Sequence, residues 1–343
     1  MRLNGNKSKQ EGYIMNYSMQ IRKRASYTPA WLLGLGLLAV TSTVLAQQAV
    51  NETRETGEAP HVDIEHMNGK AVIKGWEQQQ VRVVGELGKR TEEFIFTSEG
   101  NRVSIRVEVA RKRNDWGFGG DSDGDDLTIY VPQKSRLSYN SINASVAISD
   151  VLNDTQIEVV NGDVDARGLA GRISLESVNG DIDIDGISGD LSIETVNGHI
   201  RGSHRAEGEG RFESVNGDIE ISSDSPEMQV ETVNGDIELA LQNVNELDLN
   251  TVNGRVEAAM SLMDSGDVRA SSVGGSIELS FQESVSARFD IEAHAGGRII
   301  NNISNEQMMK AKYGPRRWLE FSHNGGNARV EISTVSGRVT VNN

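Results

Sequence analysis

Apolar residues recur at fixed positions through the second half of the chain. Counted from the Val of each Val-Asn-Gly, they lie at −5, −3, 0, +4 and +6, for example Ile173, Leu175, Val178, Ile182 and Ile184. Because apolar and polar residues alternate on both sides of the Asn-Gly, each unit predicts two strands with one buried face apiece. The alternation shifts phase at Ser177-Val178, which indicates a corner or a β-bulge.

These units repeat every 18 or 19 residues. Their shared corners are Asn161-Gly162, Asn179-Gly180, Asn197-Gly198, Asn216-Gly217, Asn234-Gly235 and Asn253-Gly254. Degenerate copies are Asn143-Ala144, Val273-Gly274-Gly275, Ala295-Gly296-Gly297, Val335-Ser336-Gly337 and an isolated Met67-Asn68-Gly69. The 40 residues between Gly297 and Gly337 fit two enlarged units. A short unit of this kind cannot cover its own apolar edge, so neighbouring units must stack.

The repeat predicts an all-β fold, an elongated β-solenoid related to β-helices and β-rolls. One coil takes about 18 residues, because "DIDIDGISG" and "DLSIETVNG" are matching halves of nine residues, each a short strand that ends in a Gly corner. Stacking would align the corner Asn residues in a ladder of amide hydrogen bonds along the axis. The corner Gly would supply a backbone angle that other residues rarely adopt.

An antiparallel β-meander is the alternative, because Asn-Gly also favours two-residue hairpins. Such a hairpin would pair Leu175 with Ile184 on one face, but it would oppose Glu176 and Asp183 on the other. A solenoid stacks like charges as well, for example Asp163 over Asp181, so this test does not decide. The constant repeat length and the matching half-units favour the solenoid.

The N-terminus has the features of an export signal. Arg22, Lys23 and Arg24 precede the apolar run "AWLLGLGLLAV", and Val44-Leu45-Ala46 resembles a cleavage site. The interpretation is a signal peptide over residues 1–46, with translation starting at Met1, Met15 or Met19; an uncleaved anchor is the alternative.

The rest of the chain divides into three predicted parts. A disordered lead-in covers residues 47–60, an irregular N-terminal β cap covers 61–135, and the repeat region covers 136–343. Residues 301–318 interrupt the repeat rhythm with Tyr313, Trp318 and four basic residues, as an inserted loop or a cap.

The charge excludes several classes of partner. The net charge of the full chain is −16. The first 46 residues hold six Lys or Arg and one Glu, so their removal changes the net charge to −21. Such a surface disfavours nucleic acid and anionic lipid. There is no cysteine, hence no disulfide or thiol chemistry. The exported chain shows no second apolar segment long enough to cross a membrane.

Two stretches resemble cation sites. Asp181, Asp183 and Asp185 begin like a calcium loop, but Ser192 stands where a bidentate Glu is needed, and the intervening Ile residues indicate a strand. A better metal candidate, though a weak one, is the Gly-rich loop with Asp121, Asp123, Asp125 and Asp126, for which a solvated acidic loop is the favoured interpretation.

Candidate contact residues combine basic and aromatic side chains. They are Arg111, Lys112, Arg113, Trp116, Phe118 and, in the 301–318 insertion, Trp318. The aromatic rings of Trp116 and Phe118 would alternatively fold back onto the cap. No catalytic residue and no cofactor site is predicted: carboxylates occupy outward strand positions, the six His residues are scattered, and no nucleotide or nucleophile motif occurs.

The signal peptide, "VDIEHMNGKAVIKGW", "LTIYVP" and the serial "ETVNGDIEL" units together resemble the bacterial "putative adhesin" family, exported β-strand-repeat proteins classed as a domain of unknown function. The resemblance covers residues 61–343, and the 301–318 insertion matches it least. It implies an elongated β-helical fold and an adhesive or envelope role, and it supplies no catalytic motif.

The expected function is therefore that of an exported, non-enzymatic, adhesin-like β-solenoid. Its rigid acidic surface would bind an envelope or surface protein or a glycan, in the periplasm or at the cell surface. One alternative is a glycan-active lyase or hydrolase on a β-helix scaffold. Another is a periplasmic structural or stress-related envelope factor.

Overall fold

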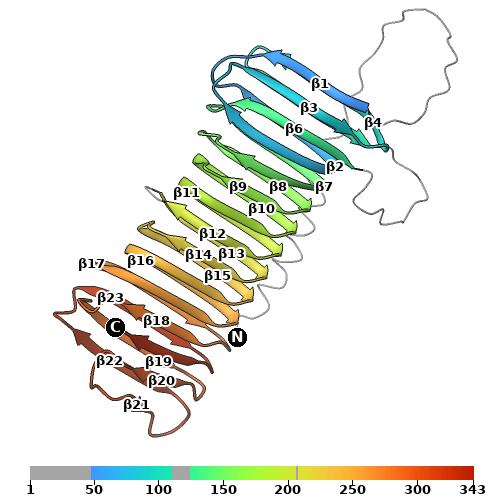
Figure 1. Ribbon diagram of the computed structural model, residues 1–343. Helices are drawn as coiled ribbons and strands as arrows, with labels where there is room; N and C mark the ends of the chain where they lie inside the picture. The colour runs from blue at the N-terminus through green and yellow to red at the C-terminus, as the bar shows by residue number, and fades with distance from the viewer. Residues whose placement is uncertain (1–47, 110–123, 206–207) are drawn as a thin grey trace, which may run out of the picture. The chain divides into compact units, whose positions relative to one another are not determined.

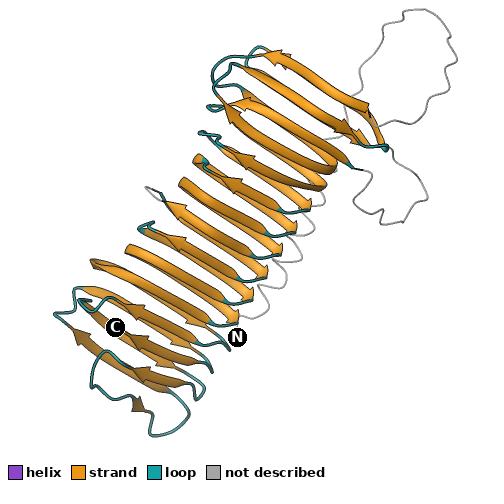
Figure 2. Cartoon of the chain, viewed as in Figure 1, coloured by secondary structure: helices purple, strands orange, loops and turns teal. Residues whose placement is uncertain are grey.

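The computed structural model describes residues 48–109, 124–205 and 208–343, all within one unit, Leu45–Asn343. Figure 2 shows strands and connecting loops throughout these residues. The all-β, solenoid-like fold predicted from the repeat is confirmed. None of the described segments is a helix that could cross a membrane. The predicted signal peptide lies outside the described residues.

The repeat region is a parallel stack (Figure 1). Its strands are β8 (Thr155–Asn161), β9 (Val164–Arg167), β10 (Ala170–Asn179), β11 (Ile182–Asn197), β12 (Ile200–Arg205), β13 (Gly210–Asn216), β14 (Ile219–Ser223), β15 (Glu227–Asn234), β16 (Ile237–Asn253), β17 (Val256–Ser272) and β18 (Ile277–Phe281). Equivalent residues pair in register, such as Asn179 with Asn197 and Ile182 with Ile200. The antiparallel meander is therefore not the arrangement of this region.

The core lies between two rows of strands, one formed by the segments that end at each corner Asn and one by the segments that follow each corner. Ile173, Leu175, Ile182 and Ile184 are buried as predicted. Val178 is not: it is only half-buried, whereas Ser177 before it is 4% exposed. The alternation thus continues to the residue before Val, and the chain turns afterwards.

A small hydroxyl residue suits that last inward position, because the corner of the preceding layer presents a backbone carbonyl there. Thr232 Oγ1, for example, donates to the carbonyl oxygen of Gly217 at 3.3 Å. This buried hydroxyl thereby has a partner and costs little, whereas the hydroxyls of Thr195 and Thr251 at the equivalent position are buried without one.

The predicted Asn ladder is present. Each corner Asn donates its side-chain amide to the Asn oxygen of the layer before it, at 2.8–3.0 Å, in the series Asn143, Asn161, Asn179, Asn197, Asn216, Asn234 and Asn253.

The prediction that backbone angle requires glycine at the corner is wrong for Gly180. The φ angle of Gly180 lies outside the left-handed region, but a Cβ at this position would overlap the carbonyl oxygen of Gly162 in the adjacent layer. Close approach of successive corners, rather than backbone angle, requires glycine here.

The N-terminal strands are β1 (Gln48–Glu55), β2 (His61–Trp76), β3 (Gln80–Leu87), β4 (Thr91–Glu99), β5 (Arg102–Val109), β6 (Asp125–Pro132) and β7 (Arg136–Ser149). Strand β2 pairs in parallel with β7 and, on its other side, with β5 and β6. Asn68 is opposite Asn143, so Met67-Asn68-Gly69 is a further copy of the unit. Antiparallel strands β4 and β3 then cover β5 and β6, and β1 covers β3.

The predicted disordered lead-in is partly wrong, because β1 is a full antiparallel partner of β3. Its polar composition reflects an edge strand in which Val50 is buried and most other side chains face solvent.

The C-terminal strands are β19 (Ala287–Ala293), β20 (Arg298–Asn301), β21 (Met309–Lys310), β22 (Arg317–His323), β23 (Ala328–Thr334) and β24 (Arg338–Asn342). Strands β23 and β24 pair with β17 and β18 on one side and with β19 and β20 on the other. The last strands of the sequence therefore lie between earlier ones. The 40-residue gap does not hold two enlarged units; it holds the 301–318 segment and β22, which runs antiparallel along β19.

Candidate binding site at the C-terminal corners

The residue that follows each corner Gly points outward and forms what we call the corner column. In spatial order, with Ser145 following the degenerate corner Ala144, it reads Lys70, Ser145, Asp163, Asp181, His199, Asp218, Asp236, Arg255, Ser276, Arg338 and Arg298. The column changes from acidic to basic at its C-terminal end. The neighbouring column, two residues further along each strand, reads Asp165, Asp183, Arg201, Glu220, Glu238, Glu257, Glu278, Thr340 and Ile300.

The acidic part of the corner column is used by the stack itself. Asp181 Oδ1 accepts the backbone N–H of His199 at 2.8 Å, and Asp236 Oδ1 accepts that of Arg255 at 2.7 Å. His199 Nδ1 takes the same role toward the backbone N–H of Asp218 at 3.0 Å. These side chains therefore join layers; Asp183 and Asp185 lie on β11, and Asp181 directly precedes it, so the three do not form a calcium loop.

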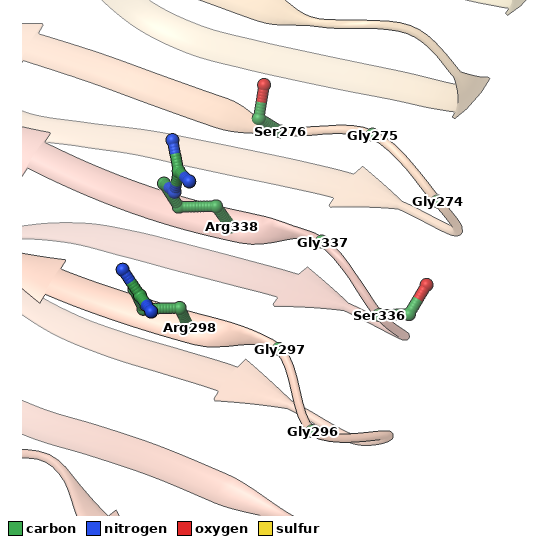
Figure 3. A pocket seen from close by; sticks show the side chains of 9 residues that line it. All are labelled: Gly274, Gly275, Ser276, Gly296, Gly297, Arg298, Ser336, Gly337 and Arg338. Atoms are coloured by element: carbon green, nitrogen blue, oxygen red, sulfur yellow. The ribbon is translucent and has the colours of Figure 1, made fainter.

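The basic part borders a hollow in the surface (Figure 3). The hollow measures about 430 Å³ and is lined by three stacked corners, Gly274-Gly275-Ser276, Ser336-Gly337-Arg338 and Gly296-Gly297-Arg298. We call these nine residues the arginine corner. A Cβ at Gly337 would overlap the carbonyl of Gly275, and one at Gly297 would overlap that of Gly337. The glycines therefore let the three corners stack closely along this surface.

Arg298 and Arg338 are opposite each other in the parallel register, and both side chains are exposed. Figure 3 shows them extending in the same direction from neighbouring strands. Arg317 of β22 donates to the carbonyl oxygen of Gly297 at 2.7 Å, which holds the edge of the hollow.

No carboxylate of the described residues forms an ion pair with Arg298 or Arg338. Arg255, earlier in the same column, shows the contrast: its guanidinium lies 3.3 Å from the Glu257 carboxylate, two residues along its strand. At the equivalent places beside Arg338 and Arg298 stand Thr340 and Ile300. The two arginines therefore carry uncompensated positive charge.

Of the predicted contact residues, Trp318 lies on β22 at this end of the stack. It is half-buried, and the guanidinium of Arg316 lies 5.5 Å from the centre of its ring. Arg316 is itself paired with Glu292. Tyr313 in the preceding loop is 83% exposed. The remaining candidates lie outside the described residues and stay predictions: Arg111, Lys112, Arg113, Trp116 and Phe118.

The metal candidates of the Gly-rich loop also lie partly outside and partly inside the described residues. Asp121 and Asp123 lie outside the described residues, so a cation site in that loop stays a prediction. Asp125 begins β6, and its side chain is buried, with its oxygens bonded to the protein. Over the described ranges no cluster of three or more potential ligands could hold a metal ion.

Asp125 belongs to a buried polar network that the sequence did not reveal. With its proton on Nε2, His66 donates to Asp125 Oδ2 at 3.2 Å and accepts at Nδ1 from the Tyr139 hydroxyl at 3.0 Å. The backbone N–H of Gly88 and the Thr91 hydroxyl donate to the other carboxylate oxygen. His66 is 59 positions from Asp125 and 73 positions from Tyr139, and the three residues lie on separate strands. The parallel register of β2, β6 and β7 brings them together.

Burial opposes ionisation of Asp125, but the hydrogen bonds from His66, Thr91 and Gly88 outweigh it and hold the pKa of this carboxyl below its usual value. Burial raises the pKa of Tyr139. His66, Asp125 and Tyr139 are each at most 2% exposed, so no substrate reaches the network and its role is to join the strands of the N-terminal cap.

A family model described as Toastrack DUF4097 matches residues 60–342. Among solved structures, a "putative cell adhesion protein" from Clostridium sporogenes is 9% identical over 86% of this chain and 99% of its own, with a TM-score of 0.21. A "putative adhesin" from Bacteroides fragilis is 12% identical over 87% of this chain and 98% of its own, with a TM-score of 0.38. A search of curated proteins finds no match.

Proposed function

Because this chain belongs to the Toastrack DUF4097 family, we propose that it is an exported, non-enzymatic, adhesin-like protein that binds a protein or glycan at the bacterial cell envelope. The export signal and the family resemblance support the location. The fold supports the binding role, since stacked layers with interlocking corner side chains form a rigid surface.

The arginine corner carries the proposal. In a chain of net charge −16, most charged groups on the repeat face solvent or pair with neighbours, yet two adjacent guanidinium groups border a hollow without a carboxylate partner. Concave surfaces with a few unpaired polar groups are typical of binding sites. The nine residues around the hollow include no Asp, Glu, His or Tyr, so the hollow lacks the acid–base pair that a glycan-active enzyme needs.

The test combines location with binding by the full chain. We expect the protein in the envelope or extracellular fraction of the producing bacterium, and saturable co-sedimentation of the purified exported protein with washed envelopes. We also expect no release of reducing ends or unsaturated products from envelope polysaccharides. Retention in the cytoplasm, or polysaccharide cleavage, would contradict the proposal.

A further inference from the structure

We propose that the arginine corner is an oxyanion-binding site that takes the carboxylate, sulfate or phosphate groups of its ligand. This inference names the ligand class for the binding role proposed above, and in that sense rests on it. It is argued from the register of the strands, the geometry of arginine and the charges that surround the hollow.

The register places two like charges side by side. Arg298 and Arg338 are direct partners on β20 and β24, and neighbouring strands lie about 4.8 Å apart. Like charges opposite each other destabilise a sheet unless something neutralises them. Elsewhere in the corner column no two basic residues are neighbours: Lys70 lies between Asp126 and Ser145, and Arg255 is paired with a carboxylate. An anion from outside would neutralise the Arg298–Arg338 pair.

The groups present suit oxyanions in particular. A guanidinium offers a planar fork of N–H donors that matches the oxygens of carboxylate, sulfate or phosphate. Two such forks on adjacent strands, with the Ser276 hydroxyl one layer further, form a row of donors along the stack. The other lining residues are glycines and Ser336, whose small size leaves room for a ligand beside this row.

The surrounding charges restrict an anionic ligand to this place. From Asp163 to Asp236 the corner column is acidic apart from His199, and from Asp165 to Glu278 the neighbouring column carries carboxylates apart from Arg201. Glu278 accepts a hydrogen bond from the Asn342 amide at 2.9 Å and forms no ion pair with either arginine. A polyanion is therefore repelled along most of the repeat and accepted at its C-terminal end.

The experiment uses the purified exported chain with three probes at constant ionic strength: inorganic sulfate, dextran sulfate and neutral dextran. The test variant is Arg298→Gln with Arg338→Gln. The control variant is Arg255→Gln with Arg329→Gln, which removes two exposed arginines that pair with Glu257 and Glu331. Both variants change the net charge by the same amount, so non-specific attraction falls equally.

We expect dextran sulfate to bind the unaltered chain and the control variant alike, and to bind the test variant about tenfold more weakly or worse. Thermal midpoints of both variants should stay near that of the unaltered chain, because the side chains are exposed. If inorganic sulfate is sufficient to raise the thermal midpoint of the unaltered chain but does not raise that of the test variant, the site takes single oxyanions. If only dextran sulfate does so, the site requires linked anionic groups.

Two results would overturn the inference: dextran sulfate binding that survives in the test variant, or binding no stronger than that of neutral dextran. Either result leaves the proposed envelope role standing, since localisation and envelope binding of the unaltered chain are measured separately. Conversely, a cytoplasmic protein that still binds dextran sulfate through Arg298 and Arg338 would contradict the envelope role alone.

Discussion

In the central repeat, from β8 to β18, the layers follow one another in the order of the sequence, whereas at each end one layer lies out of order. At the N-terminal end β2 lies between β7 and the β5–β6 pair. At the C-terminal end β23 and β24 lie between two layers that come earlier in the sequence, β17–β18 and β19–β20. The repeat uses its Asn and Asp corner side chains to join layers. At the C-terminal end the equivalent corner positions carry Arg298 and Arg338, which border the hollow.

The difference shows where a repeat protein can carry side chains that depart from the repeat pattern. A residue inside the repeat must fit the layer before it and the layer after it, so its side chain is constrained twice. At an end, one neighbour is a non-repeating strand, and this is where the buried His66–Asp125 pair and the exposed Arg298–Arg338 pair occur. Binding chemistry is therefore expected at the ends and structural regularity between them.

The strongest test of the central repeat is a charge in its core. Ile184 is 4% exposed and pairs in register with Ala166 and Gly202 of the adjacent layers. Ile184→Asp should cost about 4 kcal/mol or more, because an unpaired carboxylate would be buried. Chemical denaturation followed by circular dichroism would measure the loss. Asp183→Asn on the exposed face is the matched control, and equal midpoints for the two variants would refute the inward placement of Ile184.

A second test separates the two reasons for glycine. Gly180→Ala should cost about 3 kcal/mol or more, since the added methyl overlaps the Gly162 carbonyl of a packed neighbouring layer. Gly186→Ala should cost only about 1–2 kcal/mol, because Gly186 has φ of 63° but open space around its Cα. If Gly186→Ala were the more damaging in denaturant titrations, backbone angle would be the dominant requirement after all.

These corrections show what a repeat pattern can and cannot reveal. The parallel stack and the Asn ladder were predictable, because both follow from equal spacing of like residues. The inward position of Ser177 was not, since a hydroxyl is polar in the pattern although its partner is the Gly162 carbonyl of the preceding layer. Likewise, the need for glycine at residue 180 comes from a contact between layers, which spacing alone does not describe.

The ends were less predictable for a further reason. Their contacts join strands that are far apart in the sequence, as between His66 and Tyr139, 73 positions away. The arginine corner was missed because Arg298 and Arg338 become neighbours only when β24 is inserted beside β20. The signal that was available is the change from Asp to Arg after the corner Gly in the last copies of the unit.

The N-terminal end should respond to loss of its buried carboxylate. Asp125→Ala should cost about 2–3 kcal/mol, because the His66 ring, the Thr91 hydroxyl and the Gly88 N–H would lose their acceptor inside the protein. The cap should open before the repeat, which hydrogen exchange at β2, β6 and β7 would detect. Uniform protection across the cap and the repeat would contradict a local role for the network.

The same carboxylate predicts a pH dependence with a definite sign. Its folded pKa lies below the usual value of 3.8, so the ionised form stabilises the fold above that value, and this contribution is lost as the pH falls through 3.8 and below. Denaturation midpoints measured at descending pH should therefore fall less steeply for Asp125→Ala than for the unaltered chain. Parallel curves would show that Asp125 is not held ionised by its neighbours.

The smallest effects are expected in the Asn ladder, where they should be graded by position. Asn216 both donates to Asn197 and accepts from Asn234, whereas Asn253 donates to Asn234 and is followed by Gly274 in the next layer. Exposed hydrogen bonds of this kind contribute about 0.5–1 kcal/mol each. Asn216→Ala should therefore destabilise the repeat about twice as much as Asn253→Ala. Equal losses in denaturant titrations would mean that the ladder acts through the local corner conformation instead of through bonds between layers.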